Sequence, residues 1–232
     1  MAAKTVLYTM PISHYCVCAE RLLAFKGIPF TREVVPYHDK QSLIAATRQD
    51  YVPALLHEGR TVSWEKIPEF AEALAPKPTL YPWGNRGLPE VLDNWGHQVL
   101  EERVWRAVVT RVPPVLPDER ERWVFEEIQN RVRGPWHVLE LRRPEFEAEM
   151  VSYLGMVERM LEGRQWLLGE PSLADFGVYG GMSPLFTSGG SVPSELSNLK
   201  GWIQRIGALG GSSSAAPEGA AGPGTTRLKG PH

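Results

Sequence analysis

The first 75 residues alternate between short runs of strand-forming residues and segments in which apolar residues recur three and four positions apart. Alternating or β-branched runs indicate strands, and the 3, 4 spacing indicates amphipathic helices. Together they predict the order β-α-β-α-β-β-α, with strands at residues 4–9, 31–35, 53–57 and 60–63 and helices at residues 14–26, 39–48 and 64–74. The first three elements suit a right-handed βαβ unit, and the last three suit a hairpin followed by a helix.

The pattern changes after residue 75. Residues 75–89 contain four prolines and two glycines, which predicts a linker at residues 78–87. Beyond it, apolar residues recur only with helical spacing, at residues 88–112, 118–132, 146–161, 172–186 and 194–209. We therefore expect an α/β domain at residues 1–77 and an all-α domain at residues 88–209.

Residues 210–232 have a third kind of composition, rich in Gly, Ala, Ser and Pro, with Leu228 as the one bulky apolar residue. Such a segment buries too little apolar surface to offset about 1–2 kcal/mol of backbone ordering per residue. We expect a disordered tail that is dispensable for folding.

Charge and cysteine content narrow the function class. The 232 residues carry 25 Lys and Arg against 27 Asp and Glu, a formal net charge of −2, so there is no basic field for nucleic acid. No apolar run approaches the ~20 residues of a membrane span. The apolar stretch near the start of the chain is too short for a secretory signal. The two cysteines, Cys16 and Cys18, cannot form a disulfide framework, so we expect a cytoplasmic protein.

Ser13 is the first candidate for chemistry, because it lies directly before the predicted helix at residues 14–26. The free N–H groups of a helix start, and the roughly +0.5 charge of its dipole, stabilise an anion such as a thiolate. Serine is also among the best N-caps, which would explain Ser13 structurally. Cys16, in the first helical turn, is the competing nucleophile. The residues alone leave open Ser13, Cys16 or no catalytic residue at all.

Pro53 is the second candidate, because a proline opening a central strand cannot donate a ladder hydrogen bond. A cis Val52–Pro53 peptide would turn the Val52 backbone toward an extended ligand. A trans proline on an edge strand is the alternative, since only about 5–6% of X–Pro bonds are cis. We expect no metal: the histidines lack ligand spacing, His14 is expected in a solvated loop, and Cys18 is expected to pack without soft ligands nearby.

Five stretches, in this order and spacing, resemble the cytosolic glutathione transferases: Tyr8–Ser13, Phe25–Phe30 (FKGIPF), Val52–Leu55 (VPAL), Gly169–Phe176 (GEPSLADF) and Leu199–Ile206 (LKGWIQRI). The resemblance covers roughly residues 4–207. It implies a thioredoxin-like domain followed by a helical domain, a cis Val52–Pro53 bond, a serine-type class (theta- or zeta-like, or bacterial) and a homodimer. Within the fourth stretch, Ser172 and Asp175 have the spacing of a helix-starting capping box.

The resemblance also implies a function: transfer of glutathione, as co-substrate, to a small apolar electrophile in detoxification. It makes Ser13 the partner of the sulfur, with Cys16 as the alternative, and implies glutathione contacts from Val52, Pro53, Ser63, Trp64 and Glu65. The chain departs from the family where helix three begins, because the usual Glu/Asp-Ser pair is missing there. A non-catalytic glutathione-transferase-like scaffold, or a glutathione-dependent isomerase or dehalogenase, are therefore the alternatives.

Overall fold

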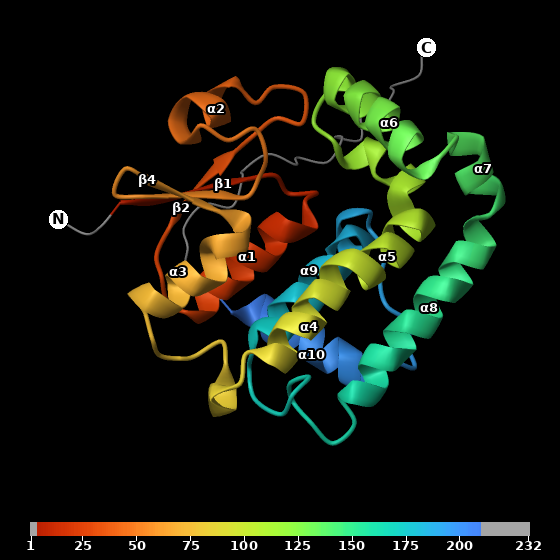
Figure 1. The fold of residues 1–232 in the computed structure, drawn as a ribbon. Coiled ribbons are helices and arrows are strands. Elements are labelled where there is room, and N and C mark those ends of the chain that lie inside the picture. Colours follow the sequence, from red (N-terminus) through yellow and green to blue (C-terminus); the bar gives the residue numbers. More distant parts are fainter. Residues whose placement is uncertain (1–3, 210–232) are drawn as a thin grey trace, which may run out of the picture.

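The computed structural model describes residues 4–209, so the predicted tail at residues 210–232 lies outside the described residues. A four-stranded sheet with three helices is followed by a part built of helices (Figure 1). This is the predicted fold class, a thioredoxin-like domain followed by a helical region. No helix between residues 4 and 209 is long and apolar enough to span a bilayer.

The sheet has the strand order β2-β1-β3-β4, from β1 (Thr5–Thr9), β2 (Thr31–Val34), β3 (Ala54–His57) and β4 (Arg60–Ser63). β2 pairs parallel with β1, as a βαβ unit requires, and β3 pairs antiparallel with β1 and β4. Leu7 faces Leu55 across the two central strands, and both are fully buried. Glu58 and Gly59 have φ of 49° and 80°, the conformation of a tight two-residue hairpin turn.

Helices α1 (His14–Phe25) and α3 (Ile67–Leu74) cover one face of the sheet, and α2 (Gln41–Thr47) covers the other (Figure 1). Buried Leu22, Leu23 and Ile67 pack with the first face, while Leu43 packs with the second. α2 begins at Gln41, two residues after the predicted start at residue 39. Lys40 occupies the cap position, although the Asp39 carboxylate accepts a hydrogen bond from the Gln41 N–H at 2.9 Å.

The helix expected at residues 64–74 is divided. Trp64–Lys66 form a 3₁₀ turn, η1, and α3 begins only at Ile67. Pro68 explains this, because its ring nitrogen has no hydrogen to donate to the carbonyl four residues earlier. A proline is instead accommodated in the first turn of a helix, where Pro68 lies.

The second part contains seven α-helices among the described residues: α4 (Gly87–Trp95), α5 (Glu101–Val108), α6 (Glu119–Arg133), α7 (Trp136–Leu141), α8 (Arg143–Met160), α9 (Leu173–Thr187) and α10 (Ser197–Ala208). The predicted apolar stripe of α8 is buried, including Leu154 and Val157. α9 is buried along nearly its whole length and contacts α1, α4 and α5. It therefore joins the two parts. The sequence pattern did not predict α7.

Between α4 and α5 the chain forms a π-helical segment, η3 (Gly96–Leu100), where one helix was expected. Gly96 lies against the backbone of α9: a Cβ built on it would be 2.7 Å from the Gly177 carbonyl oxygen. Only glycine permits this approach. Further along α9, Pro184 lies inside the helix without ending it.

The capping box at the start of α9 is present, as predicted. The Asp175 carboxylate accepts hydrogen bonds from the Ser172 N–H at 3.0 Å and the Ser172 hydroxyl at 3.1 Å. It also accepts from the Leu167 N–H at 3.0 Å and from the Trp202 indole Nε1–H at 2.8 Å. One buried carboxylate thus fixes the α9 start against the preceding loop and α10.

Candidate functional site

Ser13 lies at the N-cap of α1, with extended backbone (φ −84°, ψ 118°). Its Oγ accepts a hydrogen bond from the Cys16 N–H at 3.4 Å, which is long for such a bond. That bond uses an oxygen lone pair, so the hydroxyl proton can be donated to a ligand. The structure therefore shows the N-cap and is compatible with the predicted sulfur contact on the same side chain.

Cys16 is fully buried, and its sulfur accepts a hydrogen bond from the Met10 N–H at 3.3 Å. Burial raises the pKa of the Cys16 thiol to about 11, against smaller opposing effects of hydrogen bonding from Ser13 and Met10. At neutral pH such a group is a thiol and not the nucleophilic thiolate. This geometry favours Ser13 over Cys16 as the sulfur partner.

The Val52–Pro53 peptide bond is cis, as predicted. Pro53 is buried directly before β3, in the middle of the sheet, and Val52 is half-buried. The Lys77–Pro78 bond is also cis, which the sequence did not suggest. Pro53 lines the cavity described below.

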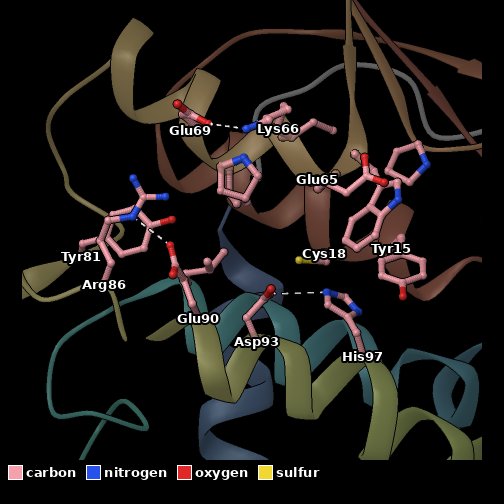
Figure 2. Close-up of a pocket in the computed structure, with 17 residues that line it drawn as sticks. Tyr15, Cys18, Glu65, Lys66, Glu69, Tyr81, Arg86, Glu90, Asp93 and His97 are labelled. Atoms are coloured by element: carbon pink, nitrogen blue, oxygen red, sulfur yellow. Dashed lines mark hydrogen bonds and ion pairs between the residues drawn. The ribbon is translucent and has the colours of Figure 1, made fainter. Parts of the chain in front are cut away.

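A pocket of about 220 Å³ lies between α1, the turn at η1 and α4 (Figure 2). It is lined by Tyr15, Cys18, Ala19, Leu22, Pro53, Trp64, Glu65, Lys66, Ile67, Pro68, Glu69, Tyr81, Arg86, Glu90, Asp93, His97 and Leu173. The residues predicted to bind glutathione divide here: Pro53, Trp64 and Glu65 line the pocket, whereas Val52 and Ser63 do not. The candidate catalytic residues Ser13 and Cys16 lie outside its wall.

Carboxylates outnumber cations along this wall. Lys66 is paired with Glu69, with Nζ and Oε2 3.1 Å apart, and Arg86 is paired with Glu90 at 2.8 Å (Figure 2). Glu65 is in none of the ion pairs formed among residues 4–209. The pocket therefore favours a ligand that carries a positive group, such as an ammonium, near Glu65.

Tyr15 is a pocket residue that sequence reasoning missed. Its ring centroid lies 4.2 Å from that of Trp64 and 4.4 Å from that of His97. Its hydroxyl oxygen accepts a hydrogen bond from Gln98 Nε2 at 3.0 Å. This aromatic cluster closes one end of the pocket across the two parts of the molecule. Its partners lie about 50 and 80 residues away in sequence, beyond the reach of local patterns.

The expectation that His14 lies in a solvated loop is wrong, because His14 is the first residue of α1 and its side chain is mostly buried. Its side chain is 13% exposed, and Nδ1 is 3.6 Å from Glu101 Oε1. Burial lowers the pKa of His14 to about 3, with further lowering from nearby His97 and Arg133. Burial likewise raises the pKa of Glu101 to about 7. A neutral His14 cannot supply positive charge to a thiolate at Ser13.

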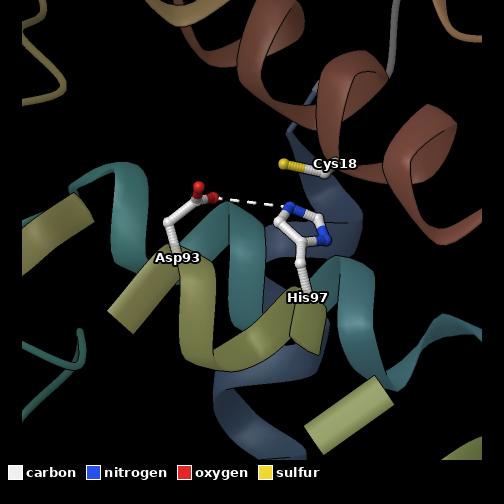
Figure 3. Close-up of side chains that lie close together, drawn as sticks. All are labelled: Cys18, Asp93 and His97. Carbon is white, nitrogen blue, oxygen red and sulfur yellow. Dashed lines mark ion pairs between the residues drawn. The ribbon is translucent and has the colours of Figure 1, made fainter. Parts of the chain in front are cut away.

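Cys18 was expected to have no soft ligand nearby, and the structure places a carboxylate and an imidazole beside it. Cys18, Asp93 and His97 come together on the pocket wall, with their sulfur, oxygen and nitrogen atoms within 4.8 Å of one another (Figure 3). Asp93 and His97 are four residues apart, which places both on one face of a helix. That spacing was the available sequence signal.

Comparison with known proteins agrees with this architecture. Residues 7–65 match the family described as glutathione S-transferase, N-terminal domain. A search of curated proteins gave no match. The matched segment includes the α1 start, the cis proline and the first two residues of η1. The match agrees with the predicted family over residues 7–65; the serine-type class stays a prediction.

Solved structures of low sequence identity share the fold over nearly the whole chain. The glutathione transferase GSTFuA3 from Phanerochaete chrysosporium is 18% identical, with a TM-score of 0.74 over 89% of this chain and 97% of its own. Glutaredoxin 2 from Salmonella typhimurium, solved with glutathione, is 15% identical, with a TM-score of 0.70 over 90% and 95%. A Ceriporiopsis subvermispora glutathione S-transferase, also solved with glutathione, is 19% identical, with a TM-score of 0.67 over 93% and 100%.

Proposed function

We propose that this protein, which has a glutathione S-transferase N-terminal domain and the glutathione-transferase fold, binds glutathione and transfers it to a small apolar electrophile. One observation carries the proposal. The family match at residues 7–65 spans every residue predicted for the site, from Ser13 to Glu65, and the cis Val52–Pro53 bond lies within it.

In the proposed chemical step, the glutathione thiolate lies at the start of α1. A free thiol has a pKa of about 8.5, and lowering it by ~2 units takes about 2.7 kcal/mol of preferential thiolate stabilisation. A hydrogen bond from the Ser13 hydroxyl to a charged sulfur contributes roughly 1.5–3 kcal/mol, and the α1 dipole adds to it. The thiolate then attacks the electrophilic carbon: a C–S bond forms, the leaving group departs with its electron pair, and the thiol proton goes to solvent.

The pocket suits the γ-glutamyl end of glutathione, which carries an ammonium and a carboxylate. In this proposal Glu65, which forms no ion pair among the described residues, binds the ammonium, and the Trp64 ring covers the aliphatic part. Pro53 lines the same wall, directly before β3. This recognition replaces the usual Glu/Asp-Ser pair with a carboxylate and an aromatic ring.

The electrophile would lie where the Ser13 loop meets the helices. Met10 and Ile12, on either side of the loop, are buried against the core of the helical part, together with Leu100 and Val104 of that part. An apolar reactant bound beside this junction would lie near the sulfur, and proximity supplies much of the rate. Detoxification in the cytoplasm is the corresponding proposed role.

A homodimer is part of the proposal. Large apolar side chains are exposed on three consecutive elements: Leu74 at 45% on α3, Trp83 at 59% in the turn Pro82–Gly84, and Leu88 and Val91 at 52% and 63% on α4. Where such groups form a contiguous patch, they mark a protein interaction surface. A second copy of this chain would cover them.

The scaffold alternative also has an observation in its favour. Ser13 does not line the pocket, and the usual Glu/Asp-Ser pair is missing at the start of helix three. A protein with these features can bind glutathione without activating its sulfur. The isomerase and dehalogenase alternatives use the same thiolate and differ in the electrophile and in the fate of the conjugate.

An assay of glutathione consumption with a panel of small apolar electrophiles, halogenated ones included, tests the proposal. We expect a conjugate at one glutathione per electrophile, and a rate that falls in Ser13→Ala. Glutathione binding without turnover on any electrophile supports the scaffold. Isomerised substrate with no net consumption of glutathione supports an isomerase, and halide release with oxidation of two glutathiones supports a reductive dehalogenase.

A further inference from the structure

Cys18, Asp93 and His97 lie where the sheet-containing part meets the helices. Cys18 is on α1, Asp93 is on α4 and His97 is in η3, and all three line the pocket (Figure 3). Their sulfur, carboxylate oxygen and ring nitrogen lie within 4.8 Å of one another. Three side chains with different ligand atoms thus converge from two parts of the molecule.

These groups are buried without the hydrogen bonds that buried polar atoms normally make. The His97 side chain is 4% exposed, and its Nδ1 has no hydrogen-bond partner among the described residues. Asp93 Oδ1 is likewise buried without one, and His97 Nε2 lies 3.5 Å from it. Since an unpaired buried polar group is costly, a ligand bound to Asp93 Oδ1 and to His97 Nε2, the ring nitrogen that faces it, would stabilise the fold.

We propose that Cys18, Asp93 and His97 bind one zinc ion between α1 and α4. Sulfur, imidazole nitrogen and carboxylate oxygen are the ligands of zinc in proteins, and three protein ligands leave a fourth position for water. Asp93 and His97 have the i, i+4 spacing with which one helix face supplies two ligands. Tetrahedral coordination brings such atoms to about 3.3–3.8 Å apart, so small side-chain rotations complete the site.

The backbone around the cluster leaves the required space. A Cβ on Gly177 of α9 would lie 2.2 Å from Asp93 Oδ1, and one on Gly180 would lie 2.9 Å from the Cys18 Cβ. These glycines let α9 approach while the three side chains face each other. Zinc binds a cysteine as the thiolate, so the Cys18 thiol proton would leave to solvent as the Zn–S bond forms.

A second group of possible ligands, His38, Asp118 and Glu121, is less suitable. Glu121 Oε1 already accepts a hydrogen bond from the Tyr37 N–H at 3.1 Å, and Asp118 Oδ1 accepts one from the Glu121 N–H at 2.8 Å. It also contains no sulfur. It provides matched controls, because ion binding there would carry no thiolate signature.

The test is a Co²⁺ titration of the untagged, chelator-treated full chain in buffer without glutathione, followed by displacement with Zn²⁺. We expect one equivalent of Co²⁺ with a thiolate-to-cobalt charge-transfer band in the near ultraviolet. Zn²⁺ should remove the band and raise the melting temperature. Cys18→Ser should abolish the band, and His97→Gln should lower zinc affinity at least tenfold, whereas His38→Gln should change neither.

Several results would overturn the site: no band, a band that survives Cys18→Ser, or affinity lost in His38→Gln but kept in His97→Gln. If the Cys18 and His97 variants do not fold, X-ray absorption at the zinc edge of the wild-type protein decides the question. One sulfur and two or three nitrogen or oxygen neighbours support the site, and an absence of sulfur contradicts it. Because glutathione is absent throughout, the outcome is independent of the proposed transferase activity.

Discussion

At the residue scale, the central question is how one hydroxyl can serve both a helix and a ligand. The Ser13 oxygen accepts from the Cys16 N–H over 3.4 Å, so the capping bond is weak, and its proton can be donated to a sulfur. Removing the hydroxyl should thus lower the rate of conjugation more than it lowers the stability of the fold.

For Ser13→Ala we expect the thiol pKa of bound glutathione to rise and turnover near neutral pH to fall about 10- to 150-fold, the equivalent of losing about 1.5–3 kcal/mol of thiolate stabilisation. Stability should fall by no more than about 1 kcal/mol. The conjugation rate against pH, together with a denaturant melt, measures both. A loss of stability with an unmoved rate profile would mean that Ser13 is only a cap.

The buried Cys16 thiol gives a pH-dependent prediction. With its pKa raised to about 11 by burial, Cys16 carries about one thiolate per thousand molecules at pH 8, against a sizeable fraction for a free thiol. We expect iodoacetamide to leave Cys16 unmodified in the folded protein at pH 7–8, with slow reaction that accelerates as pH rises. Peptide mapping after alkylation in a chelating buffer measures this. Rapid modification of Cys16 at pH 7 would restore it as the nucleophile candidate.

At this scale the sequence predicted what local chemistry determines. Pro53 at a strand start, within a family-like motif, led correctly to the cis bond, and Trp64 and Glu65 do line the pocket. Tyr15 and His97 were missed because their stacking joins α1 to η3, and such a pairing has no local signature. His14 was misplaced because burial by another helix decided its environment.

At the element scale, the glycines of α9 determine how closely the helices pack. A Cβ on Gly181 would lie 2.2 Å from the Gly96 carbonyl oxygen, a contact that backbone must move to relieve. Gly207 in α10 is a natural control, because a Cβ there meets nothing within 4 Å.

For Gly181→Ala we expect a net destabilisation of about 1–3 kcal/mol from overpacking. Gly207→Ala should be neutral or stabilising by up to about 1 kcal/mol, since alanine favours a helix. Urea unfolding of both variants measures the difference. Equal stabilities would show that α9 is not packed against η3 as described.

Element types were predicted where periodicity was clear, and boundaries were missed where tertiary contacts intervened. The order of the first seven elements followed from the pattern, and the stripe of α8 identified its buried face. The 3₁₀ turn at Trp64–Lys66 followed instead from Pro68, and η3 follows from the contact of Gly96 with α9. Pro68 is visible in the sequence, whereas the contact of Gly96 with α9 is known only once the two helices are placed together.

At the scale of the whole molecule, the exposed apolar side chains of α3, the turn Pro82–Gly84 and α4 support a dimer. We expect the chain to sediment at twice its 26.0 kDa mass, and Val91→Glu to shift it toward the monomer, because a buried charge opposes association. Val132→Glu on α6 is the matched control, because Val132 is about as exposed, at 65%. This variant should not shift the chain toward the monomer. Analytical ultracentrifugation measures all three. A monomeric wild type, or equal effects of the two variants, contradicts the proposed surface.

The central claim is that glutathione binds in the pocket beside Pro53, Trp64 and Glu65, and calorimetric titration of the chelator-treated wild-type protein with glutathione tests it most directly. We expect one site with micromolar to low millimolar affinity. Glu65→Lys should weaken binding at least tenfold by repelling the γ-glutamyl ammonium, and Glu33→Lys, on the exposed edge strand β2, should not. If no heat of binding is measured with glutathione up to about 10 mM, the dissociation constant is weaker than the expected range, and the account is contradicted.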